Sequence, residues 1–221
     1  MVRLLVFLGC VVMVASVAAG ATTRPADELV ALDIKLPVPA FIGTMKNPPP
    51  GAEQVPKTPR AKFFAPAGTM NLSLNRPVSS SDKEPTIGSL GLITDGDKEH
   101  GAGSYVELGP ETQWVQIDLG RSCAIHAILV WHFHGDARVY HDVVVQVSDD
   151  PDFISNVKTV FNNDRDNSSG LGLGKDREWV EYYGGKLIEG KGVRGRYVRL
   201  YSKGSTDSDM NHYTEVEVWG K

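Results

Sequence analysis

The chain contains 221 residues, of which 41% are hydrophobic and 23% charged, and this is the composition of an ordinary globular protein rather than a disordered one. The formal net charge is −4 at pH 7, and the lysines and arginines are scattered among carboxylates without forming a basic run. The composition therefore predicts no nucleic-acid partner, while mild acidity is compatible with a bound cation.

The first 21 residues have the pattern of a signal peptide. Arg3 stands near the start, residues 4–17 are apolar, and small residues fill positions 18–21. This predicts export, with the protein secreted, periplasmic or at the cell surface, and no transmembrane span after leader removal. Two alternatives are a lipid attached at Cys10 and an uncleaved anchor. Both are disfavoured, because the apolar run continues past Cys10 and is shorter than the roughly 20 residues that cross a bilayer.

Residues 22–69 are rich in proline and show neither a helical nor an alternating period. This composition predicts an extended linker, or a strap that lies on the following domain. Residues 40–42 could serve as a short apolar docking piece, and the segment could space the domain from the cell surface.

From residue 70 to the end of the chain, alternating apolar residues predict strands. Val115, Ile117 and Leu119 alternate with polar residues within 114–120, which is the period of a half-buried strand. Residues 124–133 are apolar on both parities, so we expect this strand to be buried on both faces. No amphipathic helix of more than a turn or two is evident, which favours an all-β sandwich. Further strands are predicted at residues 71–78, 143–147, 196–201 and 214–220.

Cys123 is the only cysteine left once the leader is removed, so the exported chain has no internal disulfide. It lies between two predicted strands and has no obvious base partner. We therefore expect a small buried residue rather than a nucleophile.

Six segments in series resemble a known family. They are Asn71-Leu-Ser-Leu-Asn-Arg-Pro-Val78, Thr94-Asp-Gly-Asp97, Trp114-Val-Gln-Ile-Asp-Leu-Gly120, Val145-Gln-Val-Ser-Asp-Asp150, Arg196-Tyr-Val-Arg-Leu-Tyr201 and Glu215-Val-Glu-Val-Trp-Gly220. Together they look like a discoidin domain, the coagulation factor V/VIII C-type module of the galactose-binding-domain-like superfamily. The resemblance covers residues 70–221 and implies a jelly-roll β-sandwich with ligand loops at one end. It also implies binding rather than catalysis, with a carbohydrate or glycoconjugate, or else a protein, as the partner.

The resemblance further implies a structural calcium ion between an Asp-Gly-Asp turn and the start of the last strand. Asp95 and Asp97 fit the turn, and Glu215 fits the carboxylate of the last strand. Calcium binds six to eight oxygens, many of them backbone carbonyls, so these residues suit it. His100 departs from the pattern, because imidazole is a poor calcium ligand and Glu99 or a carbonyl would have to replace it. The alternative is a plain β-turn held by an Asx hydrogen bond.

The histidine-rich stretch 131–141 is the most unusual part of the chain. His132 and His134 are two residues apart on a strand end, and a loop follows them. A sugar needs polar groups for its hydroxyls and an aromatic face for its C–H side. The predicted ligand-binding residues are Tyr105, Trp131, His132, His134, Asp136, Arg138, His212 and Tyr213.

Two other interpretations of this stretch stay open. The histidines and an Arg–Asp pair could close the strand end through hydrogen bonds alone, or His132 and His134 could belong to a transition-metal site. A cupin-like oxygenase would need a glutamate after the second histidine, where Arg138 and Val139 stand. Residues 162–170 resemble an EF-hand loop but lack its glycine and final glutamate, so we expect a solvated loop, with a second calcium site there as the weaker alternative.

The leading functional hypothesis is an exported, non-catalytic carbohydrate-binding module with a calcium-stabilised loop. A surface adhesion or scaffold module that binds protein is the first alternative. A histidine-based metalloenzyme is the second.

Overall fold

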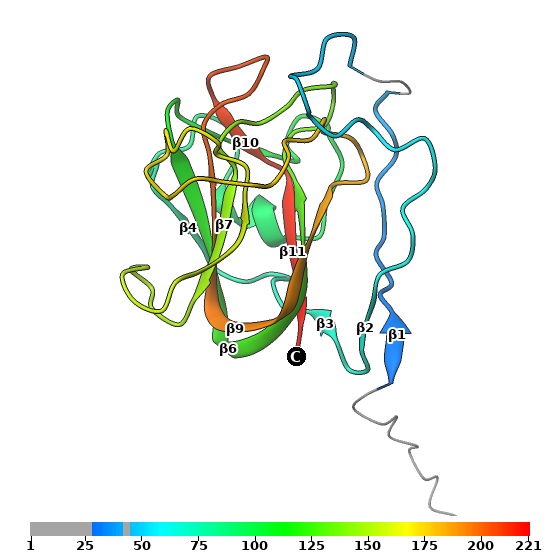
Figure 1. Cartoon of the computed structure of the whole chain (residues 1–221), viewed down its shortest axis with the longest axis vertical. Helices are drawn as coiled ribbons and strands as arrows, with labels where there is room; N and C mark the ends of the chain where they lie inside the picture. Colours follow the sequence, from blue (N-terminus) through cyan, green and yellow to red (C-terminus); the bar gives the residue numbers. More distant parts are fainter. Residues whose placement is uncertain (1–27, 42–44) are drawn as a thin grey trace, which may run out of the picture.

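The computed structural model describes residues 28–41 and 45–221. The predicted signal peptide and Ile42 of the docking piece lie outside these residues. The described part of the chain is almost entirely β (Figure 1), apart from a short 3-10 helix, η1, at Leu90–Thr94. No helix in this part has both the length and the apolar character needed to cross a bilayer.

The strands in chain order are β1 (Leu29–Ala31), β2 (Phe64–Pro66), β3 (Met70–Asn71), β4 (Val78–Ser80), β5 (Val106–Leu108), β6 (Gln113–Trp131), β7 (Val144–Ser148), β8 (Lys158–Asn162), β9 (Lys186–Ser202), β10 (Asn211–Tyr213) and β11 (Glu215–Gly220). The prediction of an all-β sandwich is confirmed. The main sheet has the order β3-β11-β6-β9-β7-β8, with β4 also paired to β6. Two further sheets of two strands each are formed by β1 with β2 and by β5 with β10.

Two long strands, β6 and β9, contribute to both layers of the sandwich. They pair antiparallel from Trp114 opposite Tyr201 to Val130 opposite Lys186. In one layer, β4 joins the first half of β6, and β7 and β8 continue beyond the second half of β9. In the other layer, β11 joins the second half of β6, and β3 joins β11. Figure 1 shows β6 and β9 curving together from one layer into the other.

The curve follows from an interrupted register and from two glycines. Pairing of β6 with β9 is irregular between Asp118 and Cys123. Gly120 lies in this interruption with φ of 81°, and Gly192, with φ of 77°, lies on β9 opposite a second interruption between Ile125 and Ala127. Residues with a Cβ rarely adopt this conformation. Irregularities of this kind bend a strand and increase its twist. Residues 114–120 and 124–133, predicted as two strands, are therefore parts of one bent strand.

The space between the layers is filled by the alternating apolar residues that the sequence pattern identified. Val115, Ile117 and Leu119 are buried, as are Val198 and Leu200 on β9. Cys123 is a free, buried cysteine, as expected. Closely packed interiors of this kind stabilise the fold by removing apolar surface from water.

The expected first strand at residues 71–78 is wrong. The segment is strand only at its ends, β3 and β4, because the chain turns between them. Arg76 N–H donates to the Ser73 carbonyl (2.9 Å) and Asn75 has φ of 56°. Asparagine tolerates this left-handed conformation better than most residues, and its presence before Arg76-Pro77 is a turn signal that strand alternation hid.

The proline-rich segment runs along the side of the sandwich, and we call its described residues, 28–41 and 45–69, the strap (Figure 1). Its two ends pair as β1 and β2, with Val30 opposite Ala65. Leu32 and Ala65 form a small apolar cluster with Ala127 of β6, against which Trp219 of β11 also packs. The outer face of β6 is covered here, which explains why residues 124–131 are apolar on both parities.

Candidate functional site

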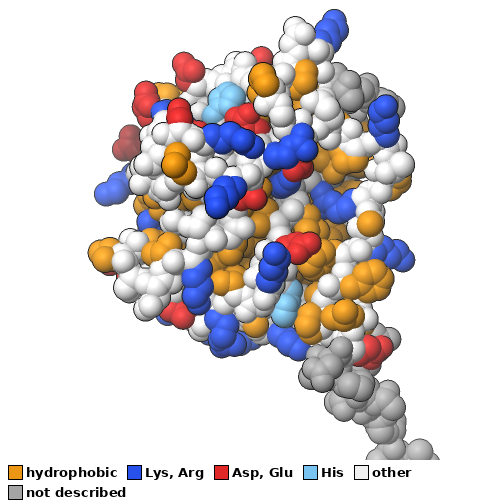
Figure 2. Space-filling model, viewed as in Figure 1, with side chains coloured by type: hydrophobic (Ala, Val, Ile, Leu, Met, Phe, Trp, Pro, Cys, Tyr) orange, Lys and Arg blue, Asp and Glu red, His pale blue; other side chains and the backbone are white. Residues whose placement is uncertain are grey.

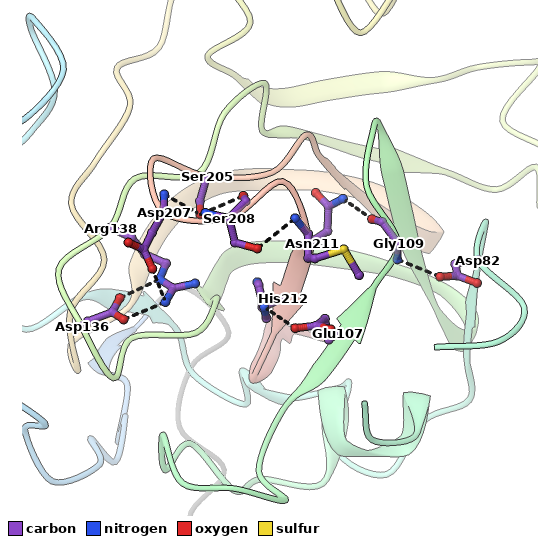
Figure 3. Close-up of polar contacts among 11 residues, drawn as sticks. Asp82, Glu107, Gly109, Asp136, Arg138, Ser205, Asp207, Ser208, Asn211 and His212 are labelled. Atoms are coloured by element: carbon purple, nitrogen blue, oxygen red, sulfur yellow. Dashed lines mark hydrogen bonds and ion pairs between the residues drawn. The ribbon is translucent and has the colours of Figure 1, made fainter. Parts of the chain in front are cut away.

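Two loops meet at one end of the sandwich, next to the small sheet of β5 and β10. The first loop, residues 132–143, joins β6 to β7, and the second, residues 203–210, joins β9 to β10. Their backbones are linked, because Thr206 N–H donates to the Val139 carbonyl (2.9 Å) and His141 N–H donates to the Gly204 carbonyl (3.1 Å). The side chains of both loops therefore occupy one surface, which we call the loop end (Figure 3).

Arg138 is the centre of the polar contacts at the loop end. Its Nε and Nη2 donate to the two carboxylate oxygens of Asp136 at 2.6 and 2.7 Å, and Nη2 also contacts Asp207 at 3.2 Å. The Arg138 side chain is 8% exposed, whereas those of Asp136 and Asp207 are 51% and 66% exposed. Burial alone would lower the pKa of Arg138, but its hydrogen bonds to Asp136 and its electrostatic interactions with Asp136 and Tyr140 together outweigh burial and raise that pKa. The result is a fixed, charged group bordered by two accessible carboxylates.

Aromatic rings lie directly beside this charge. The Arg138 guanidinium is 4.7 Å from the centre of the Phe133 ring, a cation–π distance. Tyr105 meets the Phe133 ring edge-on at 5.0 Å and is tilted against His212 at 5.8 Å. Tyr105 and Phe133 are both half-buried. The loop end thus combines planar polar groups with aromatic surface.

His212 is held between the small sheet and Arg138. Its Nε2 lies 2.9 Å from a carboxylate oxygen of Glu107, the residue opposite it on β5 (Figure 3). Burial is the main cause that lowers the pKa of His212, and the charge on Arg138 lowers it further. Because His212 is only 5% exposed, it packs beneath the surface of the loop end and is not part of that surface.

The other predicted ligand-binding residues are completely buried. Trp131 packs on the outer face of β6 and donates from Nε1 to the Tyr183 carbonyl (2.9 Å). His132 points into the sandwich, where Nδ1 lies 2.6 Å from Glu181 Oε1 and the ring contacts Tyr213 at 4.9 Å. None of these side chains reaches the surface, so Trp131, His132 and Tyr213 do not contribute to the exposed surface of the loop end.

His134 does not share the surroundings of His132. Its Nε2 lies 2.8 Å from the Lys98 carbonyl and its ring is 5.8 Å from that of His100. Burial lowers the pKa of His134. The two histidines, which the sequence predicted to point to the same side of the strand, therefore have different partners. Among the described residues, neither histidine belongs to a group of His, Cys, Asp or Glu side chains that could hold a metal ion.

One hydrogen bond links Glu215 to the turn that contains Asp95 and Asp97. Gly96 N–H, in the turn between Asp95 and Asp97, donates to Glu215 Oε2 (3.1 Å). Both aspartates also cap their own turn, since Asp95 Oδ1 accepts from Asp97 N–H (2.8 Å) and Asp97 Oδ1 accepts from Glu99 N–H (2.9 Å). The expected alternative, an Asx-type turn, is thus present alongside the carboxylates.

Glu215 carries the one feature here that a turn does not explain. The residue is fully buried, and its Oε1 has no hydrogen-bond partner. Burial raises the pKa of Glu215 to about 9. A buried carboxyl with a free oxygen is stabilised either by a proton or by a cation, so the donor set fits calcium in chemistry.

A different group of carboxylates has oxygens grouped closely enough for a metal. Asp142, Asp164 and Asp166 have ligand oxygens within 4.8 Å of one another, and this group contains none of the predicted calcium residues. The carboxylate of Asp164 accepts hydrogen bonds from Ser168 N–H (3.1 Å) and Ser169 N–H (2.9 Å). Its oxygens are therefore already engaged within the loop. The loop is solvated only in part, because residues 165–168 are exposed whereas Asn162, Asn163 and Asp164 are buried.

Three residues of the loop end were not predicted from the sequence. Phe133, Asp207 and Glu107 each contact a predicted residue, but each comes from a different segment. Asp207 lies in residues 203–211, and the Gly, Ser, Asp and Asn residues of this segment are a usable loop signal. Nothing in the local sequence connects Glu107 to His212, 105 residues away.

Comparison with solved structures supports the fold. A family 89 glycoside hydrolase from Clostridium perfringens is similar over 68% of this chain and 14% of its own length, with 22% identity and a TM-score of 0.50. A fragment of AlyQ with CBM32 and alginate lyase domains is similar over 69% of this chain and 34% of its own length, with 16% identity and a TM-score of 0.51. A chitosan-binding module from Paenibacillus sp. IK-5 is similar over 69% of this chain, with 20% identity and a TM-score of 0.49.

The similarities to the hydrolase and to the AlyQ fragment confirm the expected jelly-roll β-sandwich fold. The chain spans only 14% and 34% of the length of the hydrolase and the AlyQ fragment. No protein-family model matches the sequence, and no match was found among curated proteins.

Proposed function

We propose that this protein is an exported, non-catalytic carbohydrate-binding module that holds a glycan at the loop end. The observation that carries the proposal is the arrangement around Arg138. A fixed guanidinium lies against the Phe133 ring and is flanked by the accessible carboxylates of Asp136 and Asp207. Sugar hydroxyls need such directional donors and acceptors, while sugar C–H groups pack on aromatic rings.

Two further observations support this assignment. The fold is shared with a solved fragment that contains a CBM32 domain, although a fold alone does not fix a ligand. The loop end is also polar, since Glu107, Asp136, Arg138 and Asp207 all contribute to it. A flat apolar surface would instead favour a protein partner, so glycan binding is the better supported function.

The direct test is a glycan array with the chain from residue 22, followed by titration of the best ligand. Asp207→Asn removes the negative charge and one acceptor oxygen beside Arg138 without opening the core, and we expect affinity to fall about tenfold. Asp209→Asn is the matched control, because this exposed aspartate lies in the same loop. Failure to bind any glycan, or equal losses in both variants, would contradict the proposal.

We also propose that a calcium ion stabilises the turn at Asp95 and Asp97, with Glu215 as a ligand. The support is the buried, unpartnered Oε1 of Glu215 next to that turn. Calorimetric titration with calcium should show binding that Glu215→Gln abolishes. If Asp142→Asn abolishes it instead, the ion belongs to the other group of carboxylates.

The location that we propose is secreted, periplasmic or cell-surface. Its support is the leader pattern of residues 1–21 in the sequence. Sequencing the N-terminus of protein recovered from outside the cytoplasm tests it, and a mature chain beginning near residue 22 is the expected result.

A further inference from the structure

A groove separate from the loop end runs between the strap and β9. It consists of three adjoining cavities of about 380, 180 and 120 Å³. The first two share Glu53 and Lys186 in their walls, and the last two share Arg60 and Tyr182. Figure 2 shows this face, with Lys and Arg side chains among exposed hydrophobic ones where the strap crosses.

The groove is held in place by backbone pairing. Glu53 N–H donates to the Glu178 carbonyl (2.8 Å), and Val180 N–H donates to the Glu53 carbonyl (2.9 Å). Lys186 Nζ pairs with Glu53 Oε2 at 2.6 Å and lies 5.4 Å from the Trp179 ring. Because both backbone groups of Glu53 are already paired, a peptide could not add as a strand at this position. A ligand would have to be recognised by side chains.

Arg60 supplies an uncompensated charge to the walls of the two smaller cavities. Its Nη2 donates to the Gly184 carbonyl (2.6 Å), to the Gly185 carbonyl and to Tyr182 Oη (3.4 Å), all of them uncharged acceptors. Its Nη1 is buried and has no hydrogen-bond partner in the described part of the chain. A partly buried guanidinium without a carboxylate is costly to desolvate, so an anion would stabilise it.

The groove as a whole is also positively charged. Its walls contain five Lys and Arg residues against three Asp and Glu residues, although the chain as a whole is at −4. Tyr182 and Tyr183 add half-buried aromatic rings next to Arg60. An elongated, cationic groove with aromatic walls suits a chain of sugar rings that carry acidic groups.

We propose that this groove is a second binding site, for an extended anionic glycan chain bearing carboxylate or sulfate groups. It shares with the proposed function only the class of ligand, since its residues differ from those of the loop end. The site combines the strap with the sandwich, so both parts of the chain are needed to form it.

The test measures binding of the chain from residue 22 to polygalacturonate, dextran sulfate and neutral dextran. Arg60→Gln removes the charge but keeps a side-chain donor for the Gly184 and Gly185 carbonyls. We expect about a tenfold loss of affinity for the acidic polymer that binds, weakening further with added salt. The carboxylated and sulfated polymers distinguish the two kinds of acidic group.

Lys62→Gln is the matched control, because Lys62 is an exposed residue of the strap that lines none of the three cavities. Lys57→Gln, at an exposed lining residue, is a second probe in case Arg60→Gln unfolds the strap. Unchanged affinity in Lys57→Gln and in folded Arg60→Gln would overturn the proposal, as would the absence of binding to either acidic polymer.

Two further outcomes separate this site from its alternatives. If Asp207→Asn removes binding of the acidic polymer and Arg60→Gln does not, the anionic glycan occupies the loop end and the groove proposal fails while the proposed function stands. If polyglutamate binds with the same sensitivity to Arg60→Gln and the acidic glycans do not, the ligand is an acidic peptide and the glycan assignment is overturned.

Discussion

Glu215 couples the stability of the fold to pH. The residue is fully buried, and burial raises its pKa from 4.5 to about 9. In the unfolded chain the carboxyl ionises near its ordinary pKa, so between these values the folded state binds a proton that the unfolded state has lost. Stability from this group is therefore complete below about pH 4.5 and is lost as the pH rises toward 9.

We predict that, with a chelator present, the free energy of unfolding falls as the pH rises from 5 to 9. One proton limits the slope to about 1.4 kcal/mol per pH unit. Glu215→Gln keeps an acceptor for Gly96 N–H but cannot ionise, so its profile should be flatter than that of the wild type. Denaturant unfolding at several pH values measures this difference. The comparison of the two proteins removes the contribution of the other ionisable groups.

Calcium should change the pH dependence of the unfolding free energy of the wild type but not that of Glu215→Gln. A bound cation stabilises the ionised carboxylate, so adding calcium at pH 8 should raise the melting temperature of the wild type alone. Glu84→Gln, at an exposed site, should behave as the wild type. A calcium-dependent shift of equal size in Glu215→Gln would show that the ion is held elsewhere.

At the scale of elements, the segment between β8 and β9 depends on a close approach at Gly185. This residue has φ of 62°, and a Cβ placed there would lie 2.6 Å from the Trp131 ring. Trp131 Nε1 also donates to the Tyr183 carbonyl (2.9 Å), and Arg60 donates to the carbonyls of Gly184 and Gly185. The segment therefore connects β6 to the strap.

We predict that Gly185→Ala lowers the free energy of unfolding by about 3 kcal/mol, since it adds a steric clash to an unfavourable backbone conformation. Gly103→Ala is the matched control, because Gly103 has φ of 96° but a Cβ placed there would have no atom within 4 Å. It should cost about 1 kcal/mol from the backbone alone. Denaturant unfolding compares the two variants, and equal losses would mean that the Trp131 ring moves aside easily.

The elements that the sequence predicted well are those whose pattern is local. Alternation located β7, β11 and the halves of β6, because one buried face imposes a period of two on the residues themselves. Strand β8 was missed, since Lys158 and Thr159 are exposed and only its last residues are buried. Strands β1 and β2 were missed because they pair across more than 30 residues, which no local period encodes.

For the candidate site, the sequence predicted which segments contribute but not which residues contact one another. The sequence identified the loop that contains Asp136 and Arg138, and these residues do lie at the surface end of the sandwich. It could not show that His132 turns inward, because the partner that holds it, Glu181, is 49 residues away. A short-range pattern shows which face of a strand is buried, whereas the residue that a buried side chain contacts is determined by the packing of the whole molecule.

For the whole molecule, the strap is part of the folded unit. It covers Ala127 with Leu32 and Ala65, and it pairs at Glu53 with the segment that leads into β9. By contrast, the contacts of Arg138 with Asp136 and Asp207 include no strap residue. Stability and loop-end binding should consequently respond differently to loss of the strap.

We predict that a chain beginning at Met70 still forms the sandwich but loses about 3–5 kcal/mol of unfolding free energy, since apolar surface on β6 and β11 becomes exposed. It should bind a hydrophobic dye more strongly than the chain from residue 22, and hydrogen exchange should increase in residues 178–185. Affinity at the loop end should stay within about twofold, whereas acidic polymers should no longer bind to the groove. Equal melting temperatures for the two chains would show that the strap is not docked in solution, and the groove would then lack one of its walls.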